Sequence, residues 1–249
     1  MKTLKELSKQ EGVVLGTWLS LTDPSMVEFV KWSGFDFVCI DNEYFPFDMN
    51  MMAQMIRTAN NLDIPSLVRI SRMDDISMLI STGAYGIMIP DCNYERAKEA
   101  VDRIKYSPIG KRSMFGGTRA MRIAGMNFKE YHKKANDQVS LVVQIEGKEG
   151  MEDLDKILAL EGVDFMCTGR NDISQSLGVP GEPFHPKVDE FEDAIIKRSQ
   201  AAGKPIILGA FTVEEARGYI KKHGINMQIV SRDISFIMDG MTGFVKALK

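Results

Sequence analysis

The most constraining feature of this sequence is a regular alternation of short apolar runs and longer amphipathic stretches. The runs are rich in Val, Ile, Leu and Phe, a composition typical of strands buried in a parallel sheet. Eight runs follow one another: Val13–Leu19, Phe35–Ile40, Ser66–Ile70, Gly86–Pro90, Leu141–Glu146, Asp164–Thr168, Pro205–Gly209 and Met227–Ser231. Eight strands that alternate with helices predict a (β/α)8 TIM barrel, and residues 1–249 have the length of a single such domain.

Helix-boundary signals between the runs support this fold. Asp23-Pro24 is typical of a helix start, and Thr212 to Glu215 fits a capping box. Four predicted helix ends are followed by glycine: Gly34, Gly83, Gly162 and Gly224. The alternative fold is a doubly wound open sheet. It would need a glycine-rich phosphate turn after the first strand, which Gly16–Leu19 does not provide.

Composition excludes several functional classes. The net charge of −3 argues against a general nucleic-acid binder and indicates no attraction to membranes. No stretch reaches the roughly 20 apolar residues of a membrane helix, and Met1–Gln10 does not resemble a signal peptide, so we expect a cytoplasmic protein. Cys39, Cys92 and Cys167 lie in or beside apolar runs without metal-site spacing, which predicts buried free thiols.

One segment, Lys105–Met126, interrupts the alternation with glycines and with basic residues that no acid accompanies. Charge runs of this kind usually face solvent or a partner subunit, so a solvated or subunit-contact loop is the first interpretation. An anion-binding lid is the second.

Polar residues at the ends of the predicted strands are the candidate site, because barrel enzymes carry their catalytic groups there. Gln144 and Glu146 are two apart at the end of the fifth strand, so they project from the same face. A carboxylate in such surroundings is paired, protonated or bound to metal. Asp172 follows the sixth strand, either as a helix cap or as a second ligand. Together Glu146 and Asp172 predict a site for Mg²⁺ or Mn²⁺.

Two further strand ends carry charge. Arg69 ends an apolar run, where a guanidinium can bind a carboxylate or stabilise a developing enolate oxygen. Asp41 and Glu43 lie at the rim after the second strand, where one of them would orient other groups or bind a metal-linked water. Arg72 is expected to face solvent.

The same strand ends carry a resemblance that extends nearly from end to end. The chain resembles the HpcH/HpaI aldolases, the metal-dependent (class II) aldolases of 4-hydroxy-2-oxo acids. The matching pieces are Gly16-Thr17-Trp18-Leu19, Asp23-Pro24, Gly34-Phe35-Asp36-Phe37, Ile40-Asp41-Asn42-Glu43, Val68-Arg69, Tyr106-Ser107-Pro108-Ile109-Gly110-Lys111-Arg112, Ala135-Asn136-Asp137-Gln138, Val143-Gln144-Ile145-Glu146, Glu161-Gly162-Val163-Asp164, Gly169-Arg170-Asn171-Asp172-Ile173-Ser174 and His185-Pro186.

The resemblance implies a barrel that cleaves a 4-hydroxy-2-oxo acid into pyruvate and an aldehyde. It implies that Glu146 and Asp172 hold Mg²⁺, Mn²⁺ or Co²⁺, which the pyruvate enolate chelates. It further implies that Arg69 steadies the keto or enolate oxygen, that Gln144 lies in the same pocket, and that the chain forms a trimer or a hexamer. We therefore predict three catalytic residues, Arg69, Tyr44 and Asp41, and four substrate-binding residues, Gln144, Arg69, Gly169 and Asn171.

One departure from the family pattern concerns proton transfer. The family usually has Asp-Gly-Glu-His after the second strand, with the histidine tied to acid–base chemistry, but this chain has Asp41-Asn42-Glu43-Tyr44. A tyrosine, with a pKa of about 10, is a poor base at neutral pH. The histidines at 132, 185 and 223 do not replace it by position, so we expect them to be non-catalytic. A metal-bound water is an alternative base.

Three alternatives therefore accompany the aldolase hypothesis. Oxaloacetate decarboxylation on the same metal–enolate site needs no base for a hydroxyl, so it tolerates Tyr44. A 2-oxo-acid-binding barrel with weakened catalysis is the second alternative. A phosphosugar isomerase is disfavoured, because the turns at Gly209–Thr212 and Ser231–Asp233 are poor phosphate cradles.

Overall fold

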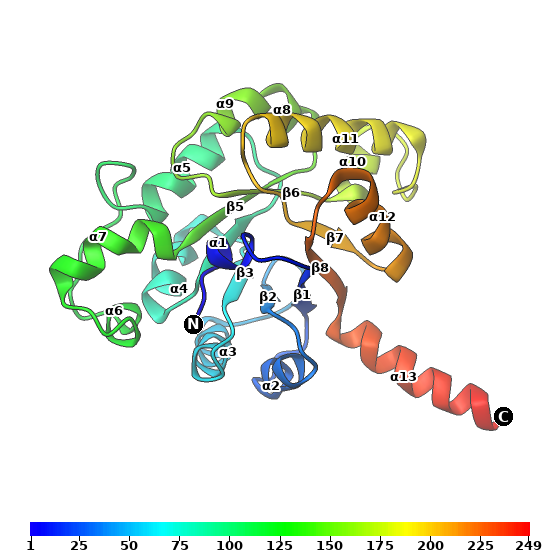
Figure 1. Cartoon of the computed structure of the whole chain (residues 1–249), viewed down its shortest axis with the longest axis horizontal. Coiled ribbons are helices and arrows are strands. Elements are labelled where there is room, and N and C mark those ends of the chain that lie inside the picture. The colour runs from blue at the N-terminus through cyan, green and yellow to red at the C-terminus, as the bar shows by residue number, and fades with distance from the viewer.

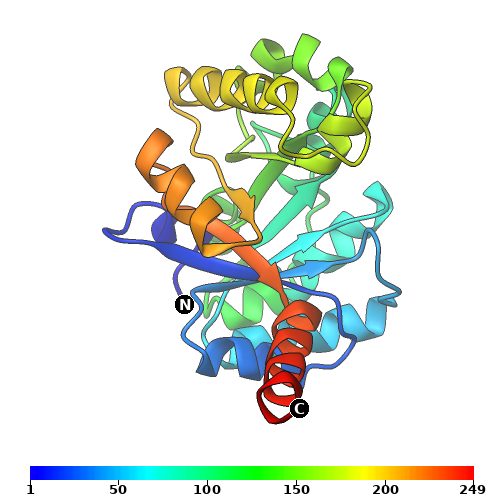
Figure 2. The ribbon, with the colours of Figure 1, turned by 90° about the vertical axis from the view of Figure 1, so that its right-hand side faces the viewer.

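Each of the eight predicted runs overlaps an observed strand, and these strands pair in parallel. The computed structural model describes all 249 residues, and the strands are β1 (Val14–Leu19), β2 (Phe37–Asp41), β3 (Ser66–Arg69), β4 (Gly86–Ile89), β5 (Ser140–Ile145), β6 (Phe165–Thr168), β7 (Leu208–Ala210) and β8 (Met227–Arg232). Their order is β6-β5-β4-β3-β2-β1-β8-β7, and a parallel bridge from Met166 to Ile206 joins the two outer strands. The predicted (β/α)8 barrel is thus confirmed (Figure 2).

Helices follow the strands and surround the barrel (Figure 1). They are α1 (Leu4–Leu7), α2 (Ser25–Trp32), α3 (Met49–Asn61), α4 (Ile76–Thr82, after a 3-10 turn at Met73–Asp75), α5 (Tyr94–Ile104), α6 (Arg119–Ile123), α7 (Phe128–Gln138), α8 (Lys148–Glu152), α9 (Leu154–Leu158), α10 (Arg170–Ser176), α11 (Pro186–Ala201), α12 (Val213–His223) and α13 (Asp233–Leu248). The four glycines expected after helices all have positive φ, from 69° to 115°. This left-handed conformation is the one that favours glycine, and it turns the chain toward the next strand.

One predicted helix start forms only in part. The Thr212 hydroxyl accepts the Glu215 N–H at 3.1 Å, as a capping box requires. The Glu215 carboxylate, however, accepts the Phe211 N–H at 2.6 Å instead of the Thr212 N–H. Thr212 is therefore the N-cap of α12, but the reciprocal bond of the capping box goes to the residue before it.

Two apolar layers fill the structure, one inside the barrel and one between strands and helices. Along β2, Phe37 and Cys39 belong to the inner cluster, whereas Val38 and Ile40 belong to the outer one. Leu4 of α1 also packs into the inner cluster, at the end where the strands begin. The barrel interior is therefore a packed core, and polar side chains collect where the strands end. The three cysteines are free and buried, as the sequence predicts.

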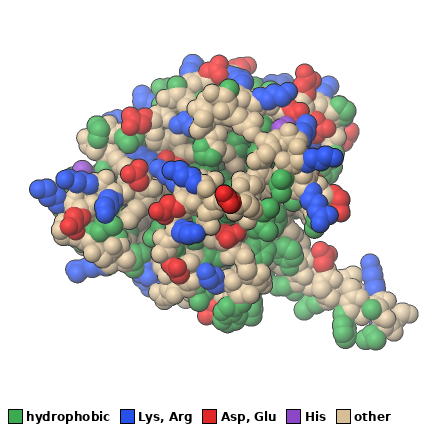
Figure 3. All heavy atoms as spheres, in the orientation of Figure 1, with side chains coloured by type: hydrophobic (Ala, Val, Ile, Leu, Met, Phe, Trp, Pro, Cys, Tyr) green, Lys and Arg blue, Asp and Glu red, His purple; other side chains and the backbone are tan.

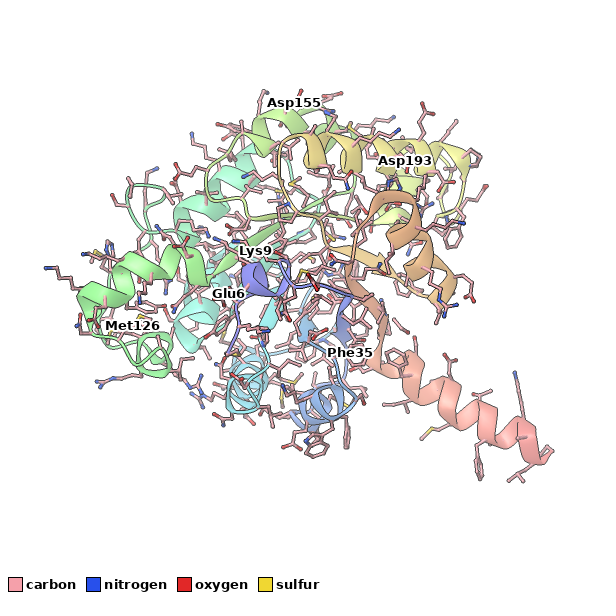
Figure 4. All side chains as sticks on the ribbon, in the orientation of Figure 1. Glu6, Lys9, Phe35, Met126, Asp155 and Asp193 are labelled. Atoms are coloured by element: carbon pink, nitrogen blue, oxygen red, sulfur yellow. The ribbon has the colours of Figure 1, made fainter.

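The basic segment Lys105–Met126 connects α5 to α6 and α7, at the end of the barrel where strands begin. Lys105 is buried and its Nζ binds Asp164 at 2.7 Å, while the Arg112 guanidinium stacks 4.6 Å from the Tyr106 ring centroid. Met126, labelled in Figure 4, lies beside α6 and α7. Because catalytic loops lie at the opposite end, this segment does not cover the mouth of its own barrel.

The last helix departs from the barrel pattern. α13 begins at Asp233, directly after β8 ends at Arg232, and it extends away from the other helices (Figure 1). The Asp233 carboxylate accepts the N–H groups of Ser20 and Leu21 at 2.9 Å, which fixes the start of the helix. No helix of the protein is long and apolar enough to span a membrane. That residues 1–249 form a single domain stays a prediction.

Candidate active site

A cavity of about 680 Å³ opens where the strands end. Residues from β1, β2, β3, β5, β6, β7 and β8, or from the loops that follow them, line it. Seven of the eight predicted site residues lie on its wall or at its rim: Tyr44, Arg69, Gln144, Glu146, Gly169, Asn171 and Asp172. The exception, Asp41, is fully buried behind Arg69.

Glu146 is a buried carboxylate held in a fixed position. One oxygen accepts the Asp91 N–H at 2.8 Å, and the other accepts the side-chain N–H of Gln144. Asp91 has a positive φ of 42°, a conformation that aspartate tolerates better than most residues, so the turn itself directs this N–H at Glu146. Gly169 completes the arrangement, since a Cβ there would lie 1.9 Å from Glu146 Oε1. Any side chain at 169 would therefore displace the carboxylate.

The surroundings of Glu146 favour its protonated form. Burial, together with the charges of Asp172 and Glu43, raises its pKa to about 8 against the partial opposition of the Asp91 N–H and Arg69. The side-chain oxygen of Gln144 is also buried beside it without a hydrogen-bond partner. A buried acid, a neighbouring acid and an unpartnered amide oxygen thus form a group of oxygen donors, and no Lys or Arg forms a salt bridge with either acid.

Asp172 lies in the first turn of α10, on the same cavity as Glu146. The helix cap is Gly169, and no side chain caps the helix through a hydrogen bond. The interpretation of Asp172 as a simple helix cap is therefore wrong. Its carboxylate lines the cavity without a capping hydrogen bond, and the N-terminus of α10 adds partial positive charge there.

Arg69 is held by acids on one side and by aromatic rings on two others. Its Nε and Nη2 donate to the two Asp41 oxygens at 2.9 and 2.7 Å, and Nη1 lies 3.2 Å from Glu43. Its guanidinium carbon lies 4.3 Å from the Trp18 ring centroid and 5.0 Å from that of Tyr44. Asp41 thus acts through Arg69, whose orientation it fixes, and its predicted catalytic role stays a prediction.

Tyr44 is poorly suited to accept a proton. Its side chain is 60% exposed at the rim, and partial burial together with Glu43 and Asp172 raises the pKa of Tyr44 to about 12. No histidine lines the cavity. His132 stacks on Tyr106, His185 accepts the Lys187 N–H at the start of α11, and His223 pairs with Asp193 at 3.1 Å.

The cavity wall carries a second polar network, which was not predicted from the sequence. Glu192 of α11 is 2% exposed and accepts hydrogen bonds from Thr168, Arg170 and Tyr219. Arg170 also pairs with Asp189. The sequence does contain an indication of it, because Glu192 is an acid on the apolar face of a helix. It lies one turn after buried Val188 and one turn before Ile195 and Ile196.

The acidic cavity and the fixed arginine lie at the carboxyl ends of the barrel strands, which is where (β/α)8 enzymes carry their active sites. The sequence model described as HpcH/HpaI aldolase/citrate lyase matches residues 14–237, and the chain belongs to this family. It is an enzyme of the aldolase class, the carbon–carbon lyases.

Three similar proteins illustrate the relationship. The 2-dehydro-3,6-dideoxy-6-sulfogluconate aldolase of Pseudomonas putida is 30% identical over 97% of this chain and 94% of its own length. The 4-hydroxy-2-oxo-heptane-1,7-dioate aldolase of Shigella sonnei is 34% identical over 78% of this chain and 75% of its own. The crystal structure of an HpcH/HpaI aldolase from Desulfitobacterium hafniense superposes with a TM-score of 0.92, with 28% identity, over 100% of this chain and 97% of its own.

Glu146 makes the stability of the metal-free protein depend on pH. A folded-state pKa of about 8, against an ordinary value of 4.5, means that the folded protein keeps a proton that the unfolded chain releases. Stability is therefore present at low pH and is lost as the pH rises toward 8. We expect Glu146→Gln to reduce this loss by about 2 to 4 kcal/mol. Urea denaturation in EDTA, from about pH 5 to about pH 8, measures it. The exposed control Glu152→Gln should behave as wild type, and equal slopes for both variants would contradict the prediction.

Proposed function

We propose that this protein is a divalent-metal-dependent (class II) aldolase that cleaves a 4-hydroxy-2-oxo acid into pyruvate and an aldehyde. The observation that carries the proposal is the buried Glu146 carboxylate, which shares the cavity with Asp172 and forms no salt bridge with a Lys or Arg. The names of the relatives from Pseudomonas putida and Shigella sonnei, both aldolases, support the same reaction type.

Glu146 and Asp172 would hold the metal, and the donor set fits Mg²⁺, Mn²⁺ or Co²⁺. The protein contains no group of three or more His, Cys, Asp or Glu arranged around one point. Two carboxylates suffice for a hard cation that keeps water and substrate oxygens as its other ligands. When bound, such a cation supplies positive charge that stabilises an enolate and binds the oxygens of a 2-oxo acid.

The remaining residues position the substrate. Arg69, fixed by Asp41 and Glu43, directs its guanidinium toward the cavity, where it would stabilise the negative oxygen that develops as the carbon–carbon bond breaks. Gln144 keeps one amide oxygen free for the site, and Gly169 leaves backbone space beside Glu146. Asn171 lies at the rim of the cavity and would contact the substrate from α10.

The metal requirement tests the proposal directly. EDTA should abolish pyruvate release from 4-hydroxy-2-oxo-heptane-1,7-dioate, and Mg²⁺, Mn²⁺ or Co²⁺ should restore it. Asp172→Asn should raise the metal concentration for half-maximal activity about 100-fold or more. Asp155→Asn, a surface control labelled in Figure 4, should not. Pyruvate release that persists in EDTA would refute the metal role. Binding of oxalate with Mg²⁺ but no turnover would favour a 2-oxo-acid-binding protein.

The rim tyrosine supplies a test of the reaction type. Aldol cleavage needs a base for the substrate hydroxyl, whereas oxaloacetate decarboxylation does not, and Tyr44 has a pKa of about 12. We expect Tyr44→His to increase kcat for aldol cleavage about 10-fold or more and to leave oxaloacetate decarboxylation unchanged. Tyr44→Phe is the control that removes only the hydroxyl. If cleavage does not rise while the wild type decarboxylates oxaloacetate faster, the decarboxylase alternative is favoured.

We further propose that the chain forms a homo-oligomer, a trimer or a hexamer. α13 exposes an apolar face that recurs at the helical period, and its members are Ile237, Met241, Phe244, Val245 and Leu248. Figure 3 shows these apolar side chains gathered on the projecting helix. α13 follows β8 without a loop and extends away from its own barrel, so a second copy is the occupant that this exposed apolar face fits. A cytoplasmic location stays a prediction.

A charge on this face should weaken the assembly. Phe244→Glu combined with Met241→Glu places carboxylates in the apolar contact, and we expect a shift to smaller species in sedimentation velocity at micromolar concentration. Lys246→Glu lies on the opposite side of α13 and should leave the mass unchanged. A wild type that sediments as a monomer would contradict the proposal.

A further inference from the structure

The charges around the cavity leave one cation without a partner. Three arginines line it, at positions 69, 170 and 232. Asp41 and Glu43 pair with Arg69, and Glu192 and Asp189 pair with Arg170. No acidic oxygen lies within 4 Å of the Arg232 guanidinium, and its side chain forms no hydrogen bond. Glu215, an acid on the same wall, instead accepts the Phe211 N–H.

The backbone of β8 is built to turn Arg232 into the cavity. Met227 and Ile229 belong to the cluster inside the barrel, while Gln228 donates to carbonyl groups of Ala216 and Ile225 outside it. Strict alternation would continue this pattern, with Ser231 inside and Arg232 outside. Arg232 nevertheless lines the cavity.

A local irregularity explains the reversal. Ser231 has a positive φ of 50°, and the pairing of β1 with β8 shifts register between Gly16 and Trp18, so that Trp18 pairs with Arg232. Irregularities of this kind redirect side chains and concentrate beside active sites. A strained serine that turns an unpaired arginine toward a catalytic cavity indicates a binding role for that arginine.

The position of Arg232 selects the part of the substrate that it meets. β6 and β7 separate β8 from β5, so Arg232 enters the cavity from a different part of its wall than Glu146, which would hold the 2-oxo acid end. Its guanidinium carbon lies 5.6 Å from the Phe45 ring centroid, and Phe184 and Phe211 line the same cavity. Arg232 is half-buried, and the Phe45 ring shields one side of its guanidinium from water, which strengthens its attraction for an oxyanion.

We propose that Arg232 binds an anionic group, such as a carboxylate, on the aldehyde portion of the substrate. The inference rests on the proposed aldolase function and specifies its substrate class: a 4-hydroxy-2-oxo acid that carries a second negative charge at its far end. Arg69 and the metal acids would take the 2-oxo acid end, and Arg232 would take the other.

The test runs the aldol reaction in the direction of condensation, with pyruvate, Mg²⁺ and matched aldehydes. Succinic semialdehyde and glutaric semialdehyde carry the anionic group, and their methyl esters lack it at nearly the same size. We expect wild-type kcat/KM to favour the acids over the esters. Arg232→Gln should lower kcat/KM for the acids about 10- to 100-fold and change it for the esters less than about threefold. Arg232→Lys should restore part of the loss for the acids.

Controls separate this role from others. Arg217→Gln removes an exposed arginine of α12 outside the cavity and should leave all four rates unchanged. Equal losses for acids and esters, or a wild type without preference for the acids, would overturn the role of Arg232 and leave the aldolase function standing. If the wild type condenses none of the aldehydes and releases no pyruvate from any hydroxy-oxo acid, the aldolase function itself fails.

Discussion

The site depends on a carboxylate placed where water cannot compensate its charge. Glu146 is 5% exposed, receives one backbone N–H, and faces a second acid. An ion in this position is unfavourable by several kcal/mol unless an opposite charge joins it. Arg69 lowers the pKa of Glu146 only in part, because Asp41 and Glu43 already engage its guanidinium, and no Lys or Arg forms a salt bridge with Glu146. The proposed affinity for a cation would therefore follow from the folding of the barrel, which holds this acid in an unfavourable position.

The barrel provides this position through a simple geometric rule. Alternate residues of each strand point inward, and apolar side chains fill the interior up to the level of Cys39, Leu67, Val142 and Cys167. The next inward residue of each of these strands is Asp41, Arg69, Gln144 and Gly169. The candidate site residues thus form the layer directly above the apolar core, and the packing of that core holds their backbones rigid.

Sequence patterns determined the parts of this structure that follow regular periods. The strands, the glycines after the helices, and the pairing of Glu146 with Gln144 on one face all come from spacings of two or from helical ends. Arg232 could not be found this way, because the positive φ of Ser231 breaks the alternation on which such a prediction depends. Glu192 was hidden in a helix whose partners come from distant segments, among them Thr168 and Tyr219. The outward course of α13 follows from Asp233, which is held by Ser20 from the other end of the chain.

The cavity has two regions that should tolerate amino-acid substitutions differently, and Gly169 lies in the less tolerant one. Beside Glu146 there is no volume for even a methyl group, so a side chain at position 169 would displace the Glu146 carboxylate. Phe184, Phe211 and Arg232 line the rest of the cavity without touching those acids through any hydrogen bond. Mutant libraries that seek new aldehyde acceptors should therefore sample this second region and keep the first fixed. Diversification among natural barrels of this type would be expected to follow the same division.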